Sequence, residues 1–507
     1  MTAVIQIEKG SWKAVELLEG MGLAAGSWMD LPVHGVTLDS RQIKGQWLFV
    51  ALQGGQGHGL DHLQQAISAG ASLVVADVSA QWPVERIQSL STTIPVLALE
   101  DLHKWASEIA ARFYAYPAAQ MRMAGVTGTN GKTSVSLFLA QALPEEWHCA
   151  VTGTTGNGFP GHLQTASHTT PDAIQAQQLL AQIRDQGAKA VAMEVSSHAL
   201  DQQRLAAVPF HTAIFTNLSR DHLDYHGSMR AYAAAKKKLF QTTSLELAVI
   251  NTDDEVGAEI LSDLKGKMTT VACHQGGRSL GADEFVRIES MQQRPQGLLL
   301  QFSSSWGKGE IDSALLGDFN ASNLILVLAV LLAWGVPMEE AIDRLERLET
   351  VPGRMQRFGG GAQPLVVVDY AHTPDALAKT LTSLRAHGAG KLLCVFGCGG
   401  NRDVGKRGQM GRLAEALADV VILTDDNPRN ESSAAILADI LEGMEAPRQA
   451  QVIPDRAQAI ATAIEMSDSG DTVLIAGKGH EAWQLVGDQR LPFSDVAQVR
   501  QVLEGSA

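Results

Sequence analysis

The sequence predicts an α/β protein of three domains, over residues 1–100, 101–350 and 351–507. Its 507 residues are too many for one hydrophobic core, because a single core stops growing at about 250–300 residues. Short apolar runs typical of strands alternate with segments of helical periodicity along most of the chain, which favours parallel sheets. A glycine-rich loop also follows one of these apolar runs and leads directly into a helical pattern.

The first domain is predicted to be a small α/β unit. The pattern indicates strands over 47–52, 71–76 and 94–99 and a helix over 60–69. Two polar patches interrupt these elements. Ser40 and Arg41 supply a hydroxyl and a guanidinium that could hold a diphosphate. The glycine-rich segment 53–62 follows a strand, which is typical of a ligand-binding loop and also of a plain turn.

The segment 124–134 reads A-G-V-T-G-T-N-G-K-T-S and predicts an ATP site. Its glycines let backbone N–H groups approach phosphate oxygens, and the helix that starts here favours an anion at its N-terminus. Lys132 can reach the β- and γ-phosphates, and Thr133 can ligate Mg²⁺. The general motif has its first glycine where this chain has Val126, so the spacing indicates a particular branch of phosphate-loop (P-loop) enzymes.

Polar groups follow the strands predicted for the central domain. A helix over 101–119 leads to strands over 121–126, 190–195, 212–217 and 245–251. Glu194 and His222 come at or just after the ends of two of these strands, where ligands of open α/β sheets bind. They are candidate Mg²⁺ ligands, directly or through water. Glu194 could instead be a surface charge, and His222 a neighbour of a helix cap.

The polar segment 167–172, which starts a predicted helix over 174–185, has two interpretations. Asp172 lies near the helix start, where a carboxylate complements the helix dipole. Alternatively, the hydroxyls of Thr169 and Thr170 bind substrate.

Two further segments are read from their residue types alone. Asn320 and Asn323 precede an apolar helix predicted over 324–333, and their amides could read a purine edge or cap that helix. The helical run 232–240 contains three consecutive lysines, a pattern typical of a solvated helix face.

The last domain repeats the pattern of strands followed by polar clusters. The strands are predicted over 365–370, 391–396, 420–424 and 472–476. Their clusters should converge, because the carboxyl ends of parallel strands meet at one edge of a sheet. Arg402 and Arg429 can each clamp a carboxylate, while Asp426 and Glu481 can hold an ammonium. This mixture predicts a zwitterionic ligand such as an amino acid.

Composition argues against several classes of protein. A net charge of −15 argues against nucleic acid as the main partner. The sequence has no apolar run of the roughly 20 residues that a membrane span needs, and its first residues do not read as a signal peptide. The four cysteines form no C-x-x-C pair, which indicates buried thiols in a reducing cytoplasm.

Seven motifs occur in an order that resembles the Mur ligase family. They are G-T-N-G-K-T-S, E-V-S-S-H, T-N-L-S-R-D-H-L-D, Y-A-A-A-K, G-D-F-N-A-S-N, P-G-R-M-Q and D-Y-A-H-T-P-D. V-T-L-D-S-R near the start and D-N-P-R in the last domain resemble the member that adds the third amino acid of a peptide. The resemblance implies a UDP-sugar-binding N-terminal domain, a central P-loop ATPase and a Rossmann-like C-terminal domain that closes over the site. We expect a monomer.

The resemblance also implies an activity, which is an ATP- and Mg²⁺-dependent ligation in peptidoglycan biosynthesis. Through an acyl phosphate, it joins meso-2,6-diaminopimelate to the D-glutamate γ-carboxylate of UDP-N-acetylmuramoyl-L-alanyl-D-glutamate. One alternative is the same ligation with L-lysine or another diamine, which Arg429 decides because lysine has no second carboxylate. A folylpolyglutamate synthetase shares the ATPase core, but V-T-L-D-S-R speaks against it. From a different class, the chain could be a P-loop switch or regulatory nucleotide-binding module without ligation. The sequence has no N-K-x-D motif, and three site-bearing domains are more than a switch needs.

The resemblance implies roles for the residues that match the family motifs. Those for the UDP-muramoyl-dipeptide are Leu38, Ser40, Gly55, Gln56, Gly57, His168, Thr169, Thr170, Ser196, Gln202 and Arg204. Those for ATP are Gly128, Thr129, Asn130, Gly131, Lys132, Thr133, Ser134, Asn323, Arg354, Asp369 and His372. Those for diaminopimelate are Arg402, Asp426, Asn427, Pro428, Arg429, Gly477 and Glu481. The catalytic residues are Lys132, Glu194, His222 and Lys236, and the Mg²⁺ ligands are Thr133, Glu194, His222 and Lys236 as N-carboxylysine.

One match changes an earlier interpretation, and one position departs from some relatives. Lys236 should be sheltered, because an amine must be neutral before it takes up CO₂ as a carbamate. Of the three consecutive lysines, only this first one matches the modified position. His168 stands where some relatives have Asn, and we expect the chemistry to be unchanged.

Overall fold

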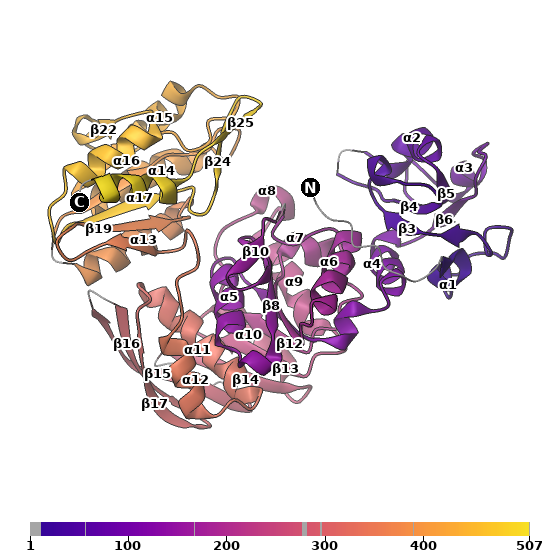
Figure 1. Ribbon diagram of the computed structural model, residues 1–507, viewed down its shortest axis with the longest axis horizontal. Helices are drawn as coiled ribbons and strands as arrows, with labels where there is room; N and C mark the ends of the chain where they lie inside the picture. The colour runs from indigo at the N-terminus through magenta and orange to yellow at the C-terminus, as the bar shows by residue number, and fades with distance from the viewer. Residues whose placement is uncertain are drawn as a thin grey trace. The chain divides into compact units, whose positions relative to one another are not determined.

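The computed structural model describes residues 12–55, 57–166, 168–275, 281–294, 297–388 and 390–505 (Figure 1). The described residues fall into two compact units. The first unit ends at Ala272, apart from a short return near residue 281. It contains the four-stranded N-terminal sheet, the two-stranded pair of β1 (Trp12–Lys13) with β2 (Pro32–Val33), and most strands of the central sheet. The second unit consists mainly of residues from Glu284 onward. No described helix is both long and apolar enough to cross a membrane.

The N-terminal sheet is parallel, and its strand order follows the chain. Its strands are β3 (Gly35–Thr37), β4 (Trp47–Ala51), β5 (Ala71–Asp77) and β6 (Val96–Leu99). Alternate residues of β4 and β5 enter two different cores, as the period of two along a strand requires. The helices are α1 (Ala14–Leu18), α2 (Leu63–Ser68), α3 (Val84–Gln88) and α4 (Leu102–Phe113). The predicted strands are confirmed, whereas the helix predicted over 101–119 ends at Phe113.

The central sheet has β7 (Arg122–Thr127) in its middle, between β11 (Ala190–Glu194) and β12 (Thr212–Phe215), all parallel. The parallel strands β8 (Cys149–Gly153) and β13 (Leu247–Asn251) flank these three. Helices of this unit are α5 (Lys132–Ala142), α6 (Ala173–Asp185), α7 (Ser197–Asp201), α8 (Leu223–His226), α9 (Met229–Lys237) and α10 (Glu255–Leu264). The mostly parallel sheet is therefore confirmed. Strand β8 and the hairpin β9 (Gly156–Phe159) and β10 (His162–Gln164) were not predicted.

The second unit begins with strands that the expected alternation of strand and helix does not contain. β15 (Glu284–Arg294), β16 (Gly297–Ser304) and β17 (Gly307–Ser313) pair antiparallel. Helices α11 (Asp318–Ala333) and α12 (Met338–Glu346) follow. Helix α11 starts six residues before the predicted 324, so Asn320 and Asn323 lie inside its first turns, where each amide bonds to a neighbour of the same segment.

The C-terminal sheet has the strand order β18-β19-β23-β20-β21-β22. Its parallel strands are β19 (Leu365–Asp369), β23 (Thr472–Ala476), β20 (Leu392–Phe396), β21 (Val420–Leu423) and β22 (Gln451–Val452), and β18 (Gln356–Gly359) is antiparallel to β19. One face packs on α13 (Pro374–His387), α14 (Gly405–Leu417) and α15 (Ser433–Glu442). The other packs on α16 (Arg456–Glu465) and α17 (Asp495–Gly505). The four strands predicted here are confirmed.

Candidate active site

The glycine-rich loop turns immediately after β7. Gly128 has φ +152°, and a Cβ there would lie 1.9 Å from Thr216 Oγ1, so no other residue fits this close approach. Gly131 has φ +85° and caps the N-terminus of α5. Val126 pairs with Glu194 and Ile214 inside the sheet. The strand therefore runs past the position where the general motif already has a glycine.

Two lysines meet the same carbonyl of this loop. Lys132 Nζ donates to Gly128 O at 2.9 Å and to Thr129 O at 2.8 Å. Lys236 Nζ donates to Gly128 O at 2.6 Å, although 108 residues separate the two in the chain. Lys236 is 1% exposed, and its amine lies 4.5 Å above the ring of Tyr232. Burial, and then the charge of Lys132, hold the pKa of Lys236 well below its ordinary value, which favours the neutral amine.

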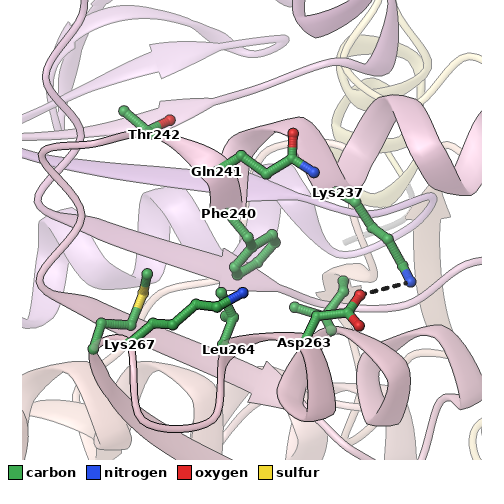
Figure 2. Close-up of a pocket in the computed structure, with 9 residues that line it drawn as sticks. Lys237, Phe240, Gln241, Thr242, Asp263, Leu264 and Lys267 are labelled. Carbon is green, nitrogen blue, oxygen red and sulfur yellow. Dashed lines mark hydrogen bonds and ion pairs between the residues drawn. The ribbon is translucent and has the colours of Figure 1, made fainter.

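The next lysine of α9 has the opposite surroundings. Lys237 forms ion pairs with Asp263 and Glu259, and it borders a surface pocket of about 460 Å³ (Figure 2). Apolar side chains including Phe240 and Leu264 also line this pocket. No residue of the glycine-rich loop lines it. The prediction of a solvated lysine face was therefore wrong for Lys236, which is buried, and suits its neighbour Lys237.

The buried carboxylate of Glu194 joins three elements. It is 1% exposed at the end of β11 and accepts a hydrogen bond from Thr133 Oγ1 at 3.0 Å. The backbone N–H and the hydroxyl of Thr154, just after β8, donate to its two oxygens at 2.7 and 3.1 Å. A Cβ on Gly153 would lie 2.0 Å from Glu194 Oε1, so this glycine makes room for the carboxylate. Glu194 is therefore no surface charge.

Thr154 also contacts the candidate site, and no motif in the sequence pointed to it. Its hydroxyl lies 3.0 Å from that of Thr169, so it connects Glu194 to the hydroxyl cluster before α6. Recognising the short run 149–153 as a strand would have placed Thr154 at a strand end, beside the other candidates.

His222 follows β12 in the left-handed conformation, with φ 52°. Its ring lies edge-on to His198, with centroids 4.9 Å apart, and 3.4 Å from a carboxylate oxygen of Asp221. Burial lowers the pKa of His222, and the charges of Lys132 and Lys236 lower it further. His222 thus belongs to the surroundings of both lysines, and it does not cap α8 with its side chain.

The described residues contain no group of three or more His, Cys, Asp or Glu side chains that could hold a metal. The Thr133 hydroxyl and the Glu194 carboxylate, 3.0 Å apart, would offer a divalent cation oxygen ligands, and the cation would need a further oxygen donor. A carbamate on Lys236 would supply that oxygen. Such an oxygen-rich set fits Mg²⁺, because Mg²⁺ prefers hard oxygen ligands.

The residues expected to hold the muramoyl-dipeptide form one hydrogen-bonded group. Thr170 Oγ1 donates to Glu194 O at 2.9 Å and accepts from Ser196 N at 3.1 Å. Arg204 donates to Thr170 O at 3.0 Å and, through two nitrogens, to Gln202 Oε1. Asp172 caps α6, which confirms its structural interpretation. His168 is exposed beside this group.

The expected UDP-binding residues follow the adjacent parallel strands β3 and β4 and so lie at one edge of the N-terminal sheet. Ser40 is buried, and its hydroxyl donates to Gln65 Oε1 at 2.7 Å, whereas the exposed Arg41 pairs with Asp39. Leu38, Gly55 and Gly57 lie in the same two segments. Gln56 lies outside the described residues.

The clusters after β20, β21 and β23 form one network. Arg429 Nη1 donates to Gly400 O at 2.8 Å, and Asn427 Nδ2 donates to Glu481 Oε2 at 2.9 Å. The buried Lys478, which was not among the predicted site residues, donates through Nζ to Asn427 Oδ1 and to Glu481 Oε2. Asp426 and Pro428 are buried, Arg402 is exposed, and Gly477 packs against the Asp426 carboxylate. Convergence of these three clusters is confirmed.

Four residues expected to contact ATP belong to the second unit. Asp369 ends β19 and accepts from Met355 N at 2.7 Å. The guanidinium of Arg354 lies 4.6 Å from the ring centroid of Tyr370. His372 Nδ1 lies 2.9 Å from Tyr370 O. Asn323 donates to Asn320 Oδ1 inside α11. The first three therefore surround the end of β19.

Three family models match successive parts of the chain. The "Mur ligase family, catalytic domain" model matches residues 32–114, "Mur ligase middle domain" matches 126–331, and "Mur ligase, glutamate ligase domain" matches 353–479.

Curated relatives match nearly the full length. A UDP-N-acetylmuramoyl-L-alanyl-D-glutamate--2,6-diaminopimelate ligase of Alkalilimnicola ehrlichii is 48% identical over 94% of this chain and 97% of its own length. Proteins of the same name from Coxiella burnetii and Pseudomonas aeruginosa are 46% and 45% identical, each over 94% of this chain and 96% of theirs.

Solved structures agree with these relatives. A structure of a UDP-N-acetylmuramoyl-L-alanyl-D-glutamate--2,6-diaminopimelate ligase has a TM-score of 0.70 and 34% identity, covering 98% of this chain and 99% of its own. MurF from Acinetobacter baumannii has a TM-score of 0.64 at 18% identity, covering 97% of this chain and 99% of its own, so it supports the fold alone.

Proposed function

The chain belongs to the Mur ligase family, and on this premise we propose that it joins meso-2,6-diaminopimelate to the D-glutamate of UDP-N-acetylmuramoyl-L-alanyl-D-glutamate. ATP is consumed, and ADP and phosphate are released. The observation that carries this proposal is the buried Lys236 amine bonded to the Gly128 carbonyl of the glycine-rich loop. It puts a group that can be modified by CO₂ beside the phosphates of a bound nucleotide.

The first step activates a carboxylate. An oxygen of the D-glutamate γ-carboxylate attacks the γ-phosphorus of ATP, forming an acyl phosphate while ADP leaves. Lys132 exchanges its contacts with the Gly128 and Thr129 carbonyls for phosphate oxygens and so offsets the charge that moves to ADP. Thr169, Thr170, Ser196, Gln202 and Arg204 hold the dipeptide in line with the phosphate, since they form one group around Glu194.

The second step forms the amide. The free-base amine of diaminopimelate attacks the acyl carbon, and phosphate leaves from the tetrahedral intermediate as the amine loses its proton. Thr133, Glu194, His222 and N-carboxylated Lys236 would hold Mg²⁺, which would supply charge stabilisation for the phosphate groups when bound. Lys236 becomes a carbamate when its neutral nitrogen bonds the carbon of CO₂ and loses a proton, and its lowered pKa favours that reaction.

The hydrogen-bonded network after β20, β21 and β23 determines which amino acid is bound. Asp426 and Glu481 accept the ammonium group at one end of diaminopimelate, and Arg402 and Arg429 bind carboxylate. Arg429 uses one nitrogen for Gly400 O, and the structure describes no other hydrogen bond of its side chain, so its remaining donors can meet a carboxylate in the two-bond geometry.

We infer further that the protein acts as a monomer in the cytoplasm. All four cysteines are free and buried, as expected of a protein in a reducing compartment. Light scattering of the purified protein at working concentration should give the mass of one chain.

An amino-acid panel tests the function directly. Purified protein is incubated with UDP-N-acetylmuramoyl-L-alanyl-D-glutamate, ATP, Mg²⁺ and one amino acid at a time, and phosphate release and the mass of the nucleotide product are measured. Diaminopimelate should give the heavier product. Product with L-lysine alone would instead support the alternative diamine, and ATP turnover that ignores every amino acid would support a nucleotide switch.

The Gly153→Ala variant tests the room made for Glu194. The added Cβ forces the carboxylate away from Thr133 Oγ1, and the hydroxyl loses its partner. We expect kcat of ligation to fall by about 10-fold or more, equivalent to ~1.4 kcal/mol. Steady-state phosphate release measures it. Gly505→Ala is the control, because a Cβ there meets nothing within 4 Å, and an unchanged kcat for Gly153→Ala would contradict the assigned role of Glu194.

A further inference from the structure

Arg456, at the start of α16, has one of the most deeply buried guanidinium groups of the described chain. Its side chain and that of Asp495, which opens α17, are each 0% exposed. Arg456 Nε donates to Asp495 Oδ1 at 2.7 Å, and Nη2 donates to Asp495 Oδ2 at 2.8 Å. This is the two-bond geometry in which arginine holds a carboxylate most firmly. Arg456 therefore connects two helices that cover the same face of the C-terminal sheet.

The remaining donors of Arg456 go to two strand-end loops. Nη2 donates to Ala476 O at 2.9 Å, at the end of β23, and Nη1 donates to Asp425 O at 3.3 Å, just beyond β21. These carbonyls immediately precede Gly477 and Asp426. Both of those residues belong to the proposed amino-acid site. One guanidinium thus ties down the two loops from behind.

This arrangement fixes the position of Asp426 and leaves its carboxylate oxygens without a hydrogen-bond partner. A Cβ on Gly477 would lie 2.5 Å from Asp426 Oδ2, so the two loops meet in close contact. In the part of the chain that the structure describes, the Asp426 carboxylate accepts no hydrogen bond, and the residue as a whole is only 8% exposed. Arg456 contributes a nearby positive charge while its N–H groups bond other oxygens. The Asp426 oxygens consequently stay open for a ligand ammonium.

A contribution to fold stability does not by itself explain why Arg456 and Asp495 form a buried ion pair. Taking both charges out of water costs about as much as their attraction returns, and an apolar pair of similar volume is often equally stable. What an apolar pair cannot do is donate hydrogen bonds to the carbonyls of Ala476 and Asp425. That difference separates a positioning role from a packing role.

We propose that Arg456, held by Asp495, is a positioning residue that sets the two loops carrying Asp426 and Gly477 for binding of the amino-acid substrate. This inference rests on the proposed ligation of diaminopimelate. It concerns a residue behind the binding surface, which does not itself touch the substrate.

The test measures the KM for each substrate in the wild type, in two variants of the ion pair and in one control variant. The double variant Arg456→Met with Asp495→Leu replaces the ion pair by apolar side chains, and Arg456→Lys keeps the charge but offers a single nitrogen. We expect both to raise the KM for diaminopimelate by about 10- to 100-fold. The KM values for ATP and the UDP substrate should stay within about twofold of wild type.

Arg385→Ala is the matched control. Arg385 also pairs with an aspartate, Asp419, and donates to two carbonyls, those of Gly390 and Leu417. It is exposed, and its partners lie before the amino ends of β20 and β21, whereas the proposed amino-acid site lies at the carboxyl ends. The KM of the Arg385→Ala variant for diaminopimelate should equal that of the wild type.

The melting temperature of the double variant should remain within about 4 °C of wild type, which keeps the comparison independent of folding. A stable double variant with an unchanged KM for diaminopimelate would overturn the proposal, and so would KM values that rise equally for all three substrates. If the wild type itself does not ligate diaminopimelate, the proposed function fails instead.

Discussion

Lys236→Ala is expected to lower kcat of ligation by ~10³-fold, because it removes the group that becomes a carbamate beside the transferring phosphate. The buried amine touches Gly128 O, and burial together with Lys132 keeps its pKa low. A lowered pKa means that more of the amine is neutral near pH 7, and only the neutral form reacts with CO₂. Steady-state phosphate release measures kcat, and ¹³C NMR after incubation with labelled bicarbonate should detect the carbamate in the wild type and not in the variant.

Lys237→Ala is the control for this experiment. It changes the next residue of the same helix, whose amine forms exposed ion pairs with Asp263 and Glu259 at the rim of the pocket in Figure 2. Its kcat should stay within about twofold of wild type. Equal losses in the two variants would show that the helix surface matters and the buried amine does not. The absence of a carbamate signal from active wild-type protein would contradict the modification.

The sequence predicted the parallel strands well, because apolar runs followed by polar clusters are a local signal. Such runs predicted where β7, β11, β20 and β23 end and where their polar clusters begin. The same logic failed for β8, a five-residue strand that includes Thr152 and Gly153, and with it Thr154 was lost. The strands β15–β17 have one exposed face and many polar residues, so their apolar signal is diluted.

Burial of charged side chains could not be predicted from local pattern. Three consecutive lysines are typical of a solvated face, and only the long-range contact of Lys236 with Gly128 decides otherwise. Arg456 and Lys478 are similar cases. Each is buried because hydrogen-bond partners come from loops and helices that are distant in the sequence. The order of the strands in the sheet brings these partners close to the charged side chain. Only the family motif, through its Y-A-A-A-K segment, indicated Lys236 in advance.

Arg429→Gly is expected to lower kcat/KM for diaminopimelate by ~10²- to 10³-fold, because a desolvated charge pair lost from one side costs about 2–5 kcal/mol. The value for L-lysine should change little, since lysine has no second carboxylate for Arg429 to bind. The ratio of the two values, measured by phosphate release in the same preparation, should therefore fall by a similar factor. Arg490→Ala is the control, because Arg490 is exposed and stacks on Trp483 nearby without entering the network.

Glycine is the informative replacement because Arg429 is strained. Its φ of 53° is a left-handed conformation that costs a non-glycine residue about 1 kcal/mol, so glycine relieves strain there. The same change removes the hydrogen bond to Gly400 O, which contributes a similar amount. The two effects oppose each other, so the melting temperature should shift by only a few degrees while selectivity is lost. An Arg429→Gly protein that still prefers diaminopimelate over lysine by the wild-type ratio would show that another group, such as Arg402, binds the distinguishing carboxylate.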